Sequence, residues 1–212
     1  MGTIIAPARA DMPTPDRLLQ QFWQIAFFSE EEGYGRAGRL IKWEGPILAR
    51  IYGENVRQYV PEVQAHLNDL SRLSGLSITI LNDLTTPSNL DIWFRTEEEM
   101  RRNRPDGLCS ARVESINFRI VQAQVNISRE IPEKRRHCLV EELSQSMGLL
   151  NDSSLFRTSI FNDHNRIIRL APWDEQMIYM LYDPRLEPGM TLDQALPTMK
   201  SIVNGFAARN PF

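Results

Sequence analysis

The stretch R-H-C-L-V-E-E-L-S-Q-S-M-G-L-L-N-D, residues 136–152, decides the fold of this chain. On a helix, which turns by about 100° per residue, its large apolar side chains fall on one side: Leu139, Val140, Leu143 and Met147. The other side carries a polar row that ends in a glycine: His137, Glu141, Gln145 and Gly148, with Cys138 and Glu142 beside it. A glycine there is typical of a helix end that needs a positive φ. The stretch therefore predicts a buried helix with a polar row on one face, running into a turn.

The rest of the chain predicts strands before this helix and helices after it. Helical spacing of apolar residues, or short charged runs, predict helices at 15–28, 54–73, 96–104, 172–182 and 191–207. Runs rich in β-branched and aromatic residues predict strands at 39–43, 46–52, 77–81, 90–95 and 112–127. The first two are either one strand broken near Gly45-Pro46 or two paired strands. The last is expected to be one long strand, paired with a short strand before it. This order is typical of an α+β domain with a mixed sheet.

A single domain accounts for most of the chain. The chain has 212 residues, of which 42% are hydrophobic, and this is enough for one good core. Residues 1–14 are rich in Pro, Ala and Thr and predict a flexible lead. Residues 15–212 are expected to form the domain, with a sheet part over about 15–150 and a helical part over about 151–212.

Charge and hydropathy exclude several classes of protein. A net charge of −3 gives no reason to expect nucleic acid as a partner. No apolar run approaches the roughly 18 residues that cross a bilayer, so we expect no transmembrane segment in the given chain. Residues 1–12 lack the apolar stretch of a secretion signal.

Two cysteines, Cys109 and Cys138, leave two alternatives open. Isolated cysteines are usually buried free thiols in a cytosolic protein. Their placement also permits a bridge, because Cys109 precedes a strand-like run and Cys138 lies one turn before Glu141. A bridge would point to an oxidising compartment.

The central stretch resembles the active-site helix of the metzincin metallopeptidases, H-E-x-x-H-x-x-G-x-x-H/D. In this register Glu142 takes the place of the general base, and the three metal-ligand positions hold Glu141, Gln145 and Asn151, with Asp152 adjacent. Zinc favours imidazole and thiolate ligands, whereas these residues offer one carboxylate and two neutral amides. The resemblance thus implies a zincin-like, metzincin-type fold without tight zinc binding.

Later segments extend the resemblance. Ser159-Ile-Phe-Asn resembles the methionine-containing turn of metzincins, with Phe161 in place of methionine, and the segment around Asp174 resembles the helix that follows. More closely, the chain resembles the bacterial secreted proteins and lipoproteins of the domain of unknown function 2927. The matching pieces include R-L-I-K-W-E-G-P at residues 39–46 and C-x-x-E-E-x-x-Q-x-x-G-L-x-N-D at residues 138–152. Membership implies an envelope location and a Cys109–Cys138 bridge, but no activity.

Under this resemblance we expect a ligand-degenerate, non-catalytic domain whose cleft binds a peptide or protein, or serves a structural role. Its cleft would be lined by Glu141, Gln145, Asn151, Asp152, His137 and His164. A buried carboxylate needs a partner, and His137, one turn before Glu141, can supply it. We expect no cofactor, a periplasmic or extracellular location, and a leader or lipid anchor only on a longer precursor.

Three alternatives remain open. One is a metal-dependent hydrolase or peptidase in which Glu142 is the base and calcium or magnesium binds Glu141, Asn151 and Asp152. Another is zinc held by His137, His164 and Glu141. The plainest is a solvated helix face with no role.

Overall fold

The computed structural model describes residues 13–28, 38–103, 108–162, 164 and 166–209. The predicted lead over residues 1–14 lies mostly outside these ranges. The helices are α1 (Pro15–Phe27), the short 3₁₀ helix η2 (Val56–Gln58), α2 (Val60–Ser74), α3 (Glu97–Asn103), α4 (Pro132–Gln145), α5 (Pro172–Leu181) and α6 (Leu192–Arg209). The strands are β1 (Ile47–Gly53), β2 (Ile78–Ile80), β3 (Leu90–Arg95), β4 (Cys109–Ile116) and β5 (Arg119–Ser128). The predicted α+β class with a mixed sheet is confirmed.

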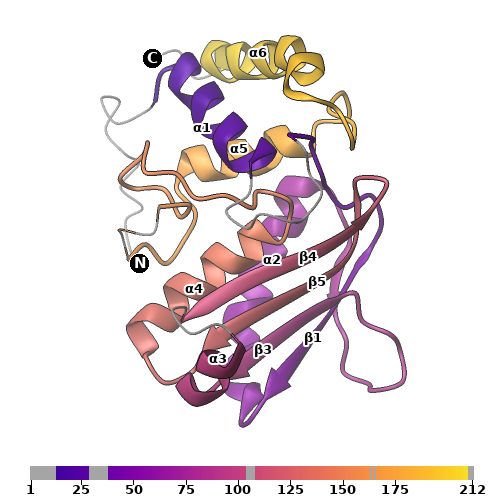
Figure 1. Ribbon diagram of the computed structural model, residues 1–212, viewed down its shortest axis with the longest axis vertical. Helices are drawn as coiled ribbons and strands as arrows, with labels where there is room; N and C mark the ends of the chain where they lie inside the picture. The colour runs from indigo at the N-terminus through magenta and orange to yellow at the C-terminus, as the bar shows by residue number, and fades with distance from the viewer. Residues whose placement is uncertain (1–12, 29–37, 104–107, 163, 165, 210–212) are drawn as a thin grey trace.

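The sheet has the strand order β2-β1-β3-β5-β4. Strands β2, β1, β3 and β5 run parallel, and β4 runs antiparallel to β5 at one edge. Helix α4 packs against β4 and β5, while α2 packs against β2 and against α4 (Figure 1). Helices α1, α5 and α6 gather beyond one end of the sheet. The central helix α4 therefore lies along the sheet beside α2, and the helical part of the molecule lies beyond the end of the sheet.

Alternation along β3 shows which face of the sheet holds the core. Leu90, Ile92 and Phe94 are buried, whereas the residues between them are partly exposed. A strand projects successive side chains to opposite faces, so the buried set faces the helices. No helix among the described residues is long and apolar enough to span a membrane.

From His137 to Ser144 every residue of α4 is buried, as expected of a central element. It begins at Pro132, a position where proline lacks only a donor that the helix does not use. It ends at Gln145, three residues before the predicted end, and a turn carries the chain to Gly148. Gly148 has the predicted positive φ, 118°. A Cβ atom there would lie 2.3 Å from the Ile41 carbonyl oxygen, so only glycine fits.

The prediction of one long strand over 112–127 was wrong. The chain turns back at Asn117 and Phe118, which both have positive φ, and β4 and β5 form an antiparallel hairpin. Asn adopts this conformation readily but Phe rarely does. Phe118 is held there by tertiary contacts, with Arg39 above its ring at 5.4 Å and Gly189 against its edge.

The predicted strand over 39–43 is also absent from the structure. This segment makes only isolated bridges, from Arg39 to Thr191 and from Lys42 to Arg119. The Lys42 ammonium donates to the Leu181 carbonyl at the end of α5 and to the Leu186 carbonyl in the turn after it, so the segment contacts the helical part of the molecule instead of entering the sheet.

The helix expected over 54–73 begins later, at Val60. The chain first forms η2, and Pro61 then occupies the first turn of α2, where proline is tolerated. The remaining predicted strands and helices are present with ends shifted by a few residues, and Thr14 caps α1 by accepting from the Arg17 N–H.

Candidate functional site

Two carboxylates on α4, those of Glu141 and Glu142, are each only 6% exposed. The polar row is therefore not a solvated helix face. His137 lies one turn earlier on the same helix and is 4% exposed. Burial of charge in this way is costly unless the groups find partners, so the polar row is held in place by specific contacts.

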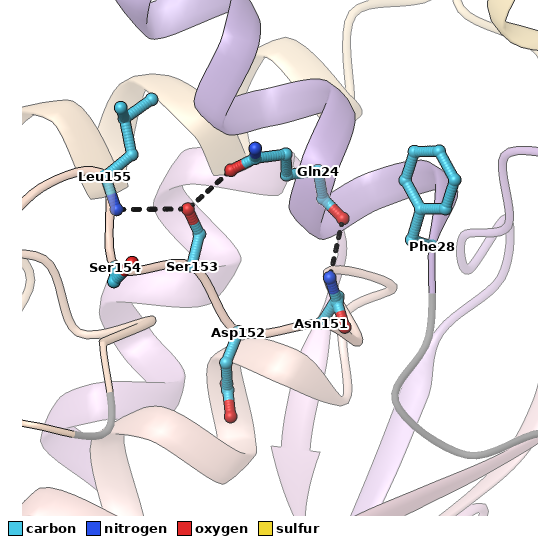
Figure 2. Close-up of a pocket in the computed structure, with 7 residues that line it drawn as sticks. All are labelled: Gln24, Phe28, Asn151, Asp152, Ser153, Ser154 and Leu155. Atoms are coloured by element: carbon cyan, nitrogen blue, oxygen red, sulfur yellow. Dashed lines mark hydrogen bonds between the residues drawn. The ribbon is translucent and has the colours of Figure 1, made fainter.

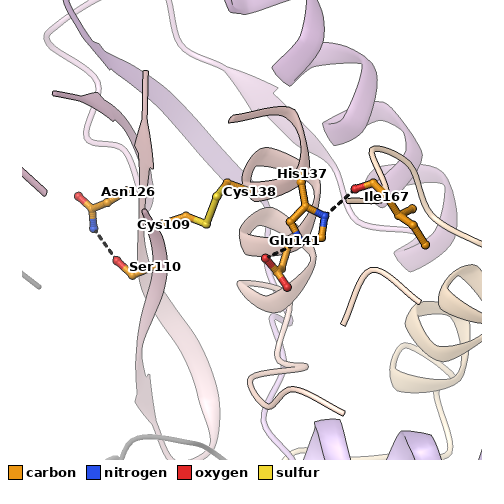
Figure 3. Close-up of a disulfide and its surroundings, with 7 residues drawn as sticks. All are labelled: Cys109, Ser110, Asn126, His137, Cys138, Glu141 and Ile167. Carbon is orange, nitrogen blue, oxygen red and sulfur yellow. Dashed lines mark hydrogen bonds and ion pairs between the residues drawn. A yellow bond between two sulfur atoms is a disulfide. The ribbon is translucent and has the colours of Figure 1, made fainter. Parts of the chain in front are cut away.

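His137 orients Glu141. Its Nδ1 lies 2.6 Å from the Ile167 carbonyl oxygen, which can only accept, so Nδ1 carries the proton (Figure 3). Its Nε2 lies 3.3 Å from the Glu141 Oε2. Burial alone would lower the pKa of His137, but the hydrogen bond and charge of Glu141, together with the Ile167 carbonyl, raise the pKa above its ordinary value. His137 is therefore the partner expected for Glu141. In its protonated form it places a positive charge beside this buried carboxylate.

The disulfide between Cys109 and Cys138 is present. It joins the first residue of β4 to α4, with the two Cα atoms 5.7 Å apart. One carboxylate oxygen each of Glu141 and Glu142 lies with the Cys109 sulfur in a group whose members are all within 4.8 Å of one another. Because that sulfur is bonded to Cys138, it is not a thiolate and is a poor metal ligand.

The side-chain amides at the other two metzincin ligand positions donate to two different partners. The Gln145 side-chain amide donates to the Asp152 carboxylate at 2.7 Å. The Asn151 amide donates to the Gln24 carbonyl at the end of α1, at 3.1 Å (Figure 2). An open pocket of about 520 Å³ lies beside this contact, lined by Gln24, Phe28, Asn151, Asp152, Ser153, Ser154 and Leu155. Asn151 therefore points toward α1, whereas the Gln145 amide is held by Asp152.

The serine turn is fixed to α5 by one buried carboxylate. Asp174 accepts from the Ser159 hydroxyl at 2.6 Å and from the backbone N–H groups of Ile160 and Ala171 at 3.0 and 2.8 Å. Burial raises the pKa of Asp174 to about 6, and these hydrogen bonds oppose the rise. Phe161, at the place of the metzincin methionine, is fully buried. The turn and the helix after it thus form one packed unit.

His164 does not join the buried row. Its side chain is exposed, and its backbone N–H donates to the Asn162 side chain at 3.0 Å. Among the described residues, the close group of metal-ligating atoms does not include it. The alternative of zinc held by His137, His164 and Glu141 therefore has no assembled site in the part of the chain that the structure describes.

One buried pair escaped the sequence reasoning. The His66 Nε2 on α2 lies 3.1 Å from the Ser144 hydroxyl on α4. That hydroxyl donates to the Val140 carbonyl at 2.6 Å, so it accepts from His66 and has no proton to give to a base. Burial lowers the pKa of His66 to about 4. The pair joins two helices and does not form a nucleophile with its base; no spacing in the sequence links these two residues.

Comparison with known proteins gives one result. Residues 15–201 match the family model described as "Protein of unknown function (DUF2927)". No curated protein matches the chain.

Proposed function

The chain belongs to this family of proteins of unknown function, DUF2927, and we propose that it is a zincin-like domain that binds an extended peptide without hydrolysing it. The elements in order support the fold assignment: a mixed sheet with an antiparallel edge strand, a buried central helix, a tight turn and a further helix. The resemblance to metzincins assigns to these elements the cleft edge, the active-site helix and the turn beneath it. Fold analogy alone supplies no activity, so the functional proposal rests on the side chains.

The proposal that the domain is non-catalytic rests on the hydrogen bonds made by the side chains at the metal-ligand positions. The side-chain amides of Gln145 and Asn151 donate to two different acceptors, the Asp152 carboxylate and the Gln24 carbonyl. Neutral amides are weak zinc ligands, and the Cys109 sulfur is bonded to Cys138 in the disulfide. These residues do not fit the zinc that the fold family implies, and no hydrolytic step is assigned to them.

The edge strand β4 supports the peptide-binding part. It is last in the strand order, so no strand among the described residues pairs with its outer side. The Ser128 N–H donates to the Leu108 carbonyl at 2.8 Å, which makes these two a hydrogen-bonded pair. Opposed residues in an antiparallel ladder alternate, so Cys109 and Ala111 direct their N–H and C=O groups away from β5. An extended peptide can add to such an edge through main-chain hydrogen bonds.

The decisive substitution is Ala111→Pro. It removes one outward N–H but no bond between β4 and β5, and proline is tolerated on edge strands. Ala111→Val keeps the N–H and serves as the matched control. Peptides are first selected from a random library on the wild-type protein, and their affinities are then measured by fluorescence anisotropy. We expect Ala111→Pro to weaken binding about tenfold or more, as the loss of an unreplaced hydrogen bond would, and Ala111→Val to bind as the wild type does.

Two results would overturn the proposal. Equal affinity of the proline and valine variants would remove the β4 edge as the binding site. Cleavage of the selected peptides in the presence of zinc, calcium or magnesium, abolished by Glu142→Gln, would establish the metal-dependent hydrolase instead. We also place the domain in an oxidising compartment, periplasmic or extracellular, because a disulfide persists there and is rarely maintained in the cytosol.

A further inference from the structure

The edge strand β4 carries two exposed side chains of opposite charge on one face. Arg112 and Glu114 lie two positions apart on this strand, and both are exposed. Successive side chains of a strand alternate between the two faces of its sheet. The two charges therefore share a face, while Val113 between them, which is 3% exposed, belongs to the hydrophobic core on the other face.

Neither charge is neutralised within the sheet. The residues directly opposite on β5 are Gln124 for Arg112 and Gln122 for Glu114, and both are uncharged. Within the described part of the chain, neither Arg112 nor Glu114 forms an ion pair or a side-chain hydrogen bond. Charges on an edge strand can serve simply to discourage pairing with other chains, so a test has to separate that role from recognition of a ligand.

A peptide added to β4 would place its side chains directly against these two charges. The outward N–H and C=O groups of β4 belong to Ala111 and Val113, and no backbone group of the described residues bonds to them. Arg112 and Glu114 would then occupy the non-hydrogen-bonded positions, where opposed Cα atoms lie about 4.5 Å apart and side chains approach most closely. Opposite charges facing each other across two strands attract, and like charges there repel.

We propose that the domain selects peptides in which a basic residue precedes an acidic residue by two positions. This inference rests on the proposed addition of a peptide to β4, and it takes the antiparallel direction because that pairing is the more stable and the more common. In such a peptide the residue opposite Glu114 comes first, and the residue opposite Arg112 comes two positions later. The residue between them lies beside Val113 on the buried face, so the motif is basic–apolar–acidic.

The test exchanges the two charges of the strand. A library of random heptapeptides displayed on phage is selected on the wild-type domain and on the Arg112→Glu, Glu114→Arg double variant, which has the same net charge. The matched control is the Glu98→Arg, Arg102→Glu double variant, which exchanges the partners of an exposed ion pair on α3. Urea unfolding verifies that all three proteins are folded.

We expect the wild-type pool to be enriched about threefold or more in the basic–x–acidic order, and the exchanged variant to enrich the acidic–x–basic order. A selected peptide is then compared with its isomer, in which the two charged residues change places and the composition stays the same. Their affinities, measured by fluorescence anisotropy, should also differ about threefold or more. The preferred isomer should be inverted on the exchanged variant and unchanged on the control.

The outcomes separate this inference from the proposed function. If the selected peptides lose affinity on Ala111→Pro but show no order of charges, peptide addition at β4 stands and selection by Arg112 and Glu114 is overturned. The acidic–x–basic order on the wild-type domain would indicate parallel addition and would also overturn the motif. If no peptide is selected, or if the selected peptides bind Ala111→Pro as well as Ala111→Val, the proposed function fails and this inference fails with it.

Discussion

His66 makes the stability of the fold depend on pH. Burial lowers its pKa to about 4, against an ordinary value near 6.5 in the unfolded chain. Between these values the unfolded chain binds a proton that the folded chain does not, so stability falls as the pH drops from about 6.5 to about 4 and then levels off. The loss attributable to His66 is about 3 kcal/mol. Charged neighbours in the adjoining pocket are Glu62, Asp69, Arg136 and Arg169.

The measurement is urea unfolding of wild type and His66→Gln at a series of pH values. Asp174 acts in the opposite sense, because its pKa is raised to about 6, above the unfolded value, so stability that is missing at neutral pH returns as the pH falls through 6. The two contributions partly cancel in the wild type. His66→Gln should therefore lose less stability on acidification than the wild type does, and parallel pH profiles would contradict the assignment.

The sequence predicted the position of some side chains in the candidate site but not of others. The spacing of the central stretch was sufficient to place His137 beside Glu141, because residues four apart lie on one helix face. It could not place the side chains of Gln145 and Asn151, which reach acceptors on the loop after α4 and at the end of α1. Such contacts depend on how distant segments pack, and a motif read along one helix contains no information about them.

Among the elements, the turn after α4 depends on one glycine. Gly148 combines a φ of 118° with a gap in which a Cβ atom would meet the Ile41 carbonyl oxygen at 2.3 Å. Gly75, at the end of α2, also has positive φ, 74°, but nothing lies within 4 Å of its Cβ position. We expect Gly148→Ala to cost at least about 3 kcal/mol, from strain and overlap together, and Gly75→Ala about 1 kcal/mol, from strain alone.

Thermal and urea unfolding of the two alanine variants decide the point. Equal losses at both positions would show that the backbone conformation, and not the close approach of residue 41, selects glycine after α4.

The hairpin of β4 and β5 shows why one element was misread. Residues 112–127 are rich in strand-forming side chains throughout, and the turn at Asn117-Phe118 lacks the glycine that usually signals a positive φ. The Phe118 ring is contacted from outside the hairpin, by Arg39 and Gly189. Local sequence therefore predicted the strand content, while the reversal that makes β4 an edge depends on tertiary contacts.

At the scale of the whole molecule, the α+β class and most of the helices and strands followed from the sequence pattern, because amphipathic patterns report which face of each element is buried; the exceptions are the strand predicted over 39–43 and the unbroken strand predicted over 112–127. The connection of the sheet to the helical part did not follow. It runs through Lys42, a buried lysine whose ammonium donates to carbonyls at the end of α5 and in the turn after it, and whose pKa is lowered by burial. A lysine in a short apolar run carries no sign of such distant acceptors.

The disulfide links β4 covalently to α4, and it should contribute to the free energy of unfolding of the whole domain. Cys109 and Cys138 are separated by 29 positions, and closing a loop of that length in the unfolded chain corresponds to about 3–4 kcal/mol in the chain-entropy model. The Cys109→Ala, Cys138→Ala double variant should lose about this much in urea unfolding, with a larger dependence on urea because its unfolded chain is more expanded. Reduced wild-type protein provides the comparison that separates the lost link from the lost side chains. If the double variant and the reduced protein both unfold at the wild-type midpoint, the bridge does not stabilise the fold, and a role confined to the position of β4 against α4 would be all that is left for it.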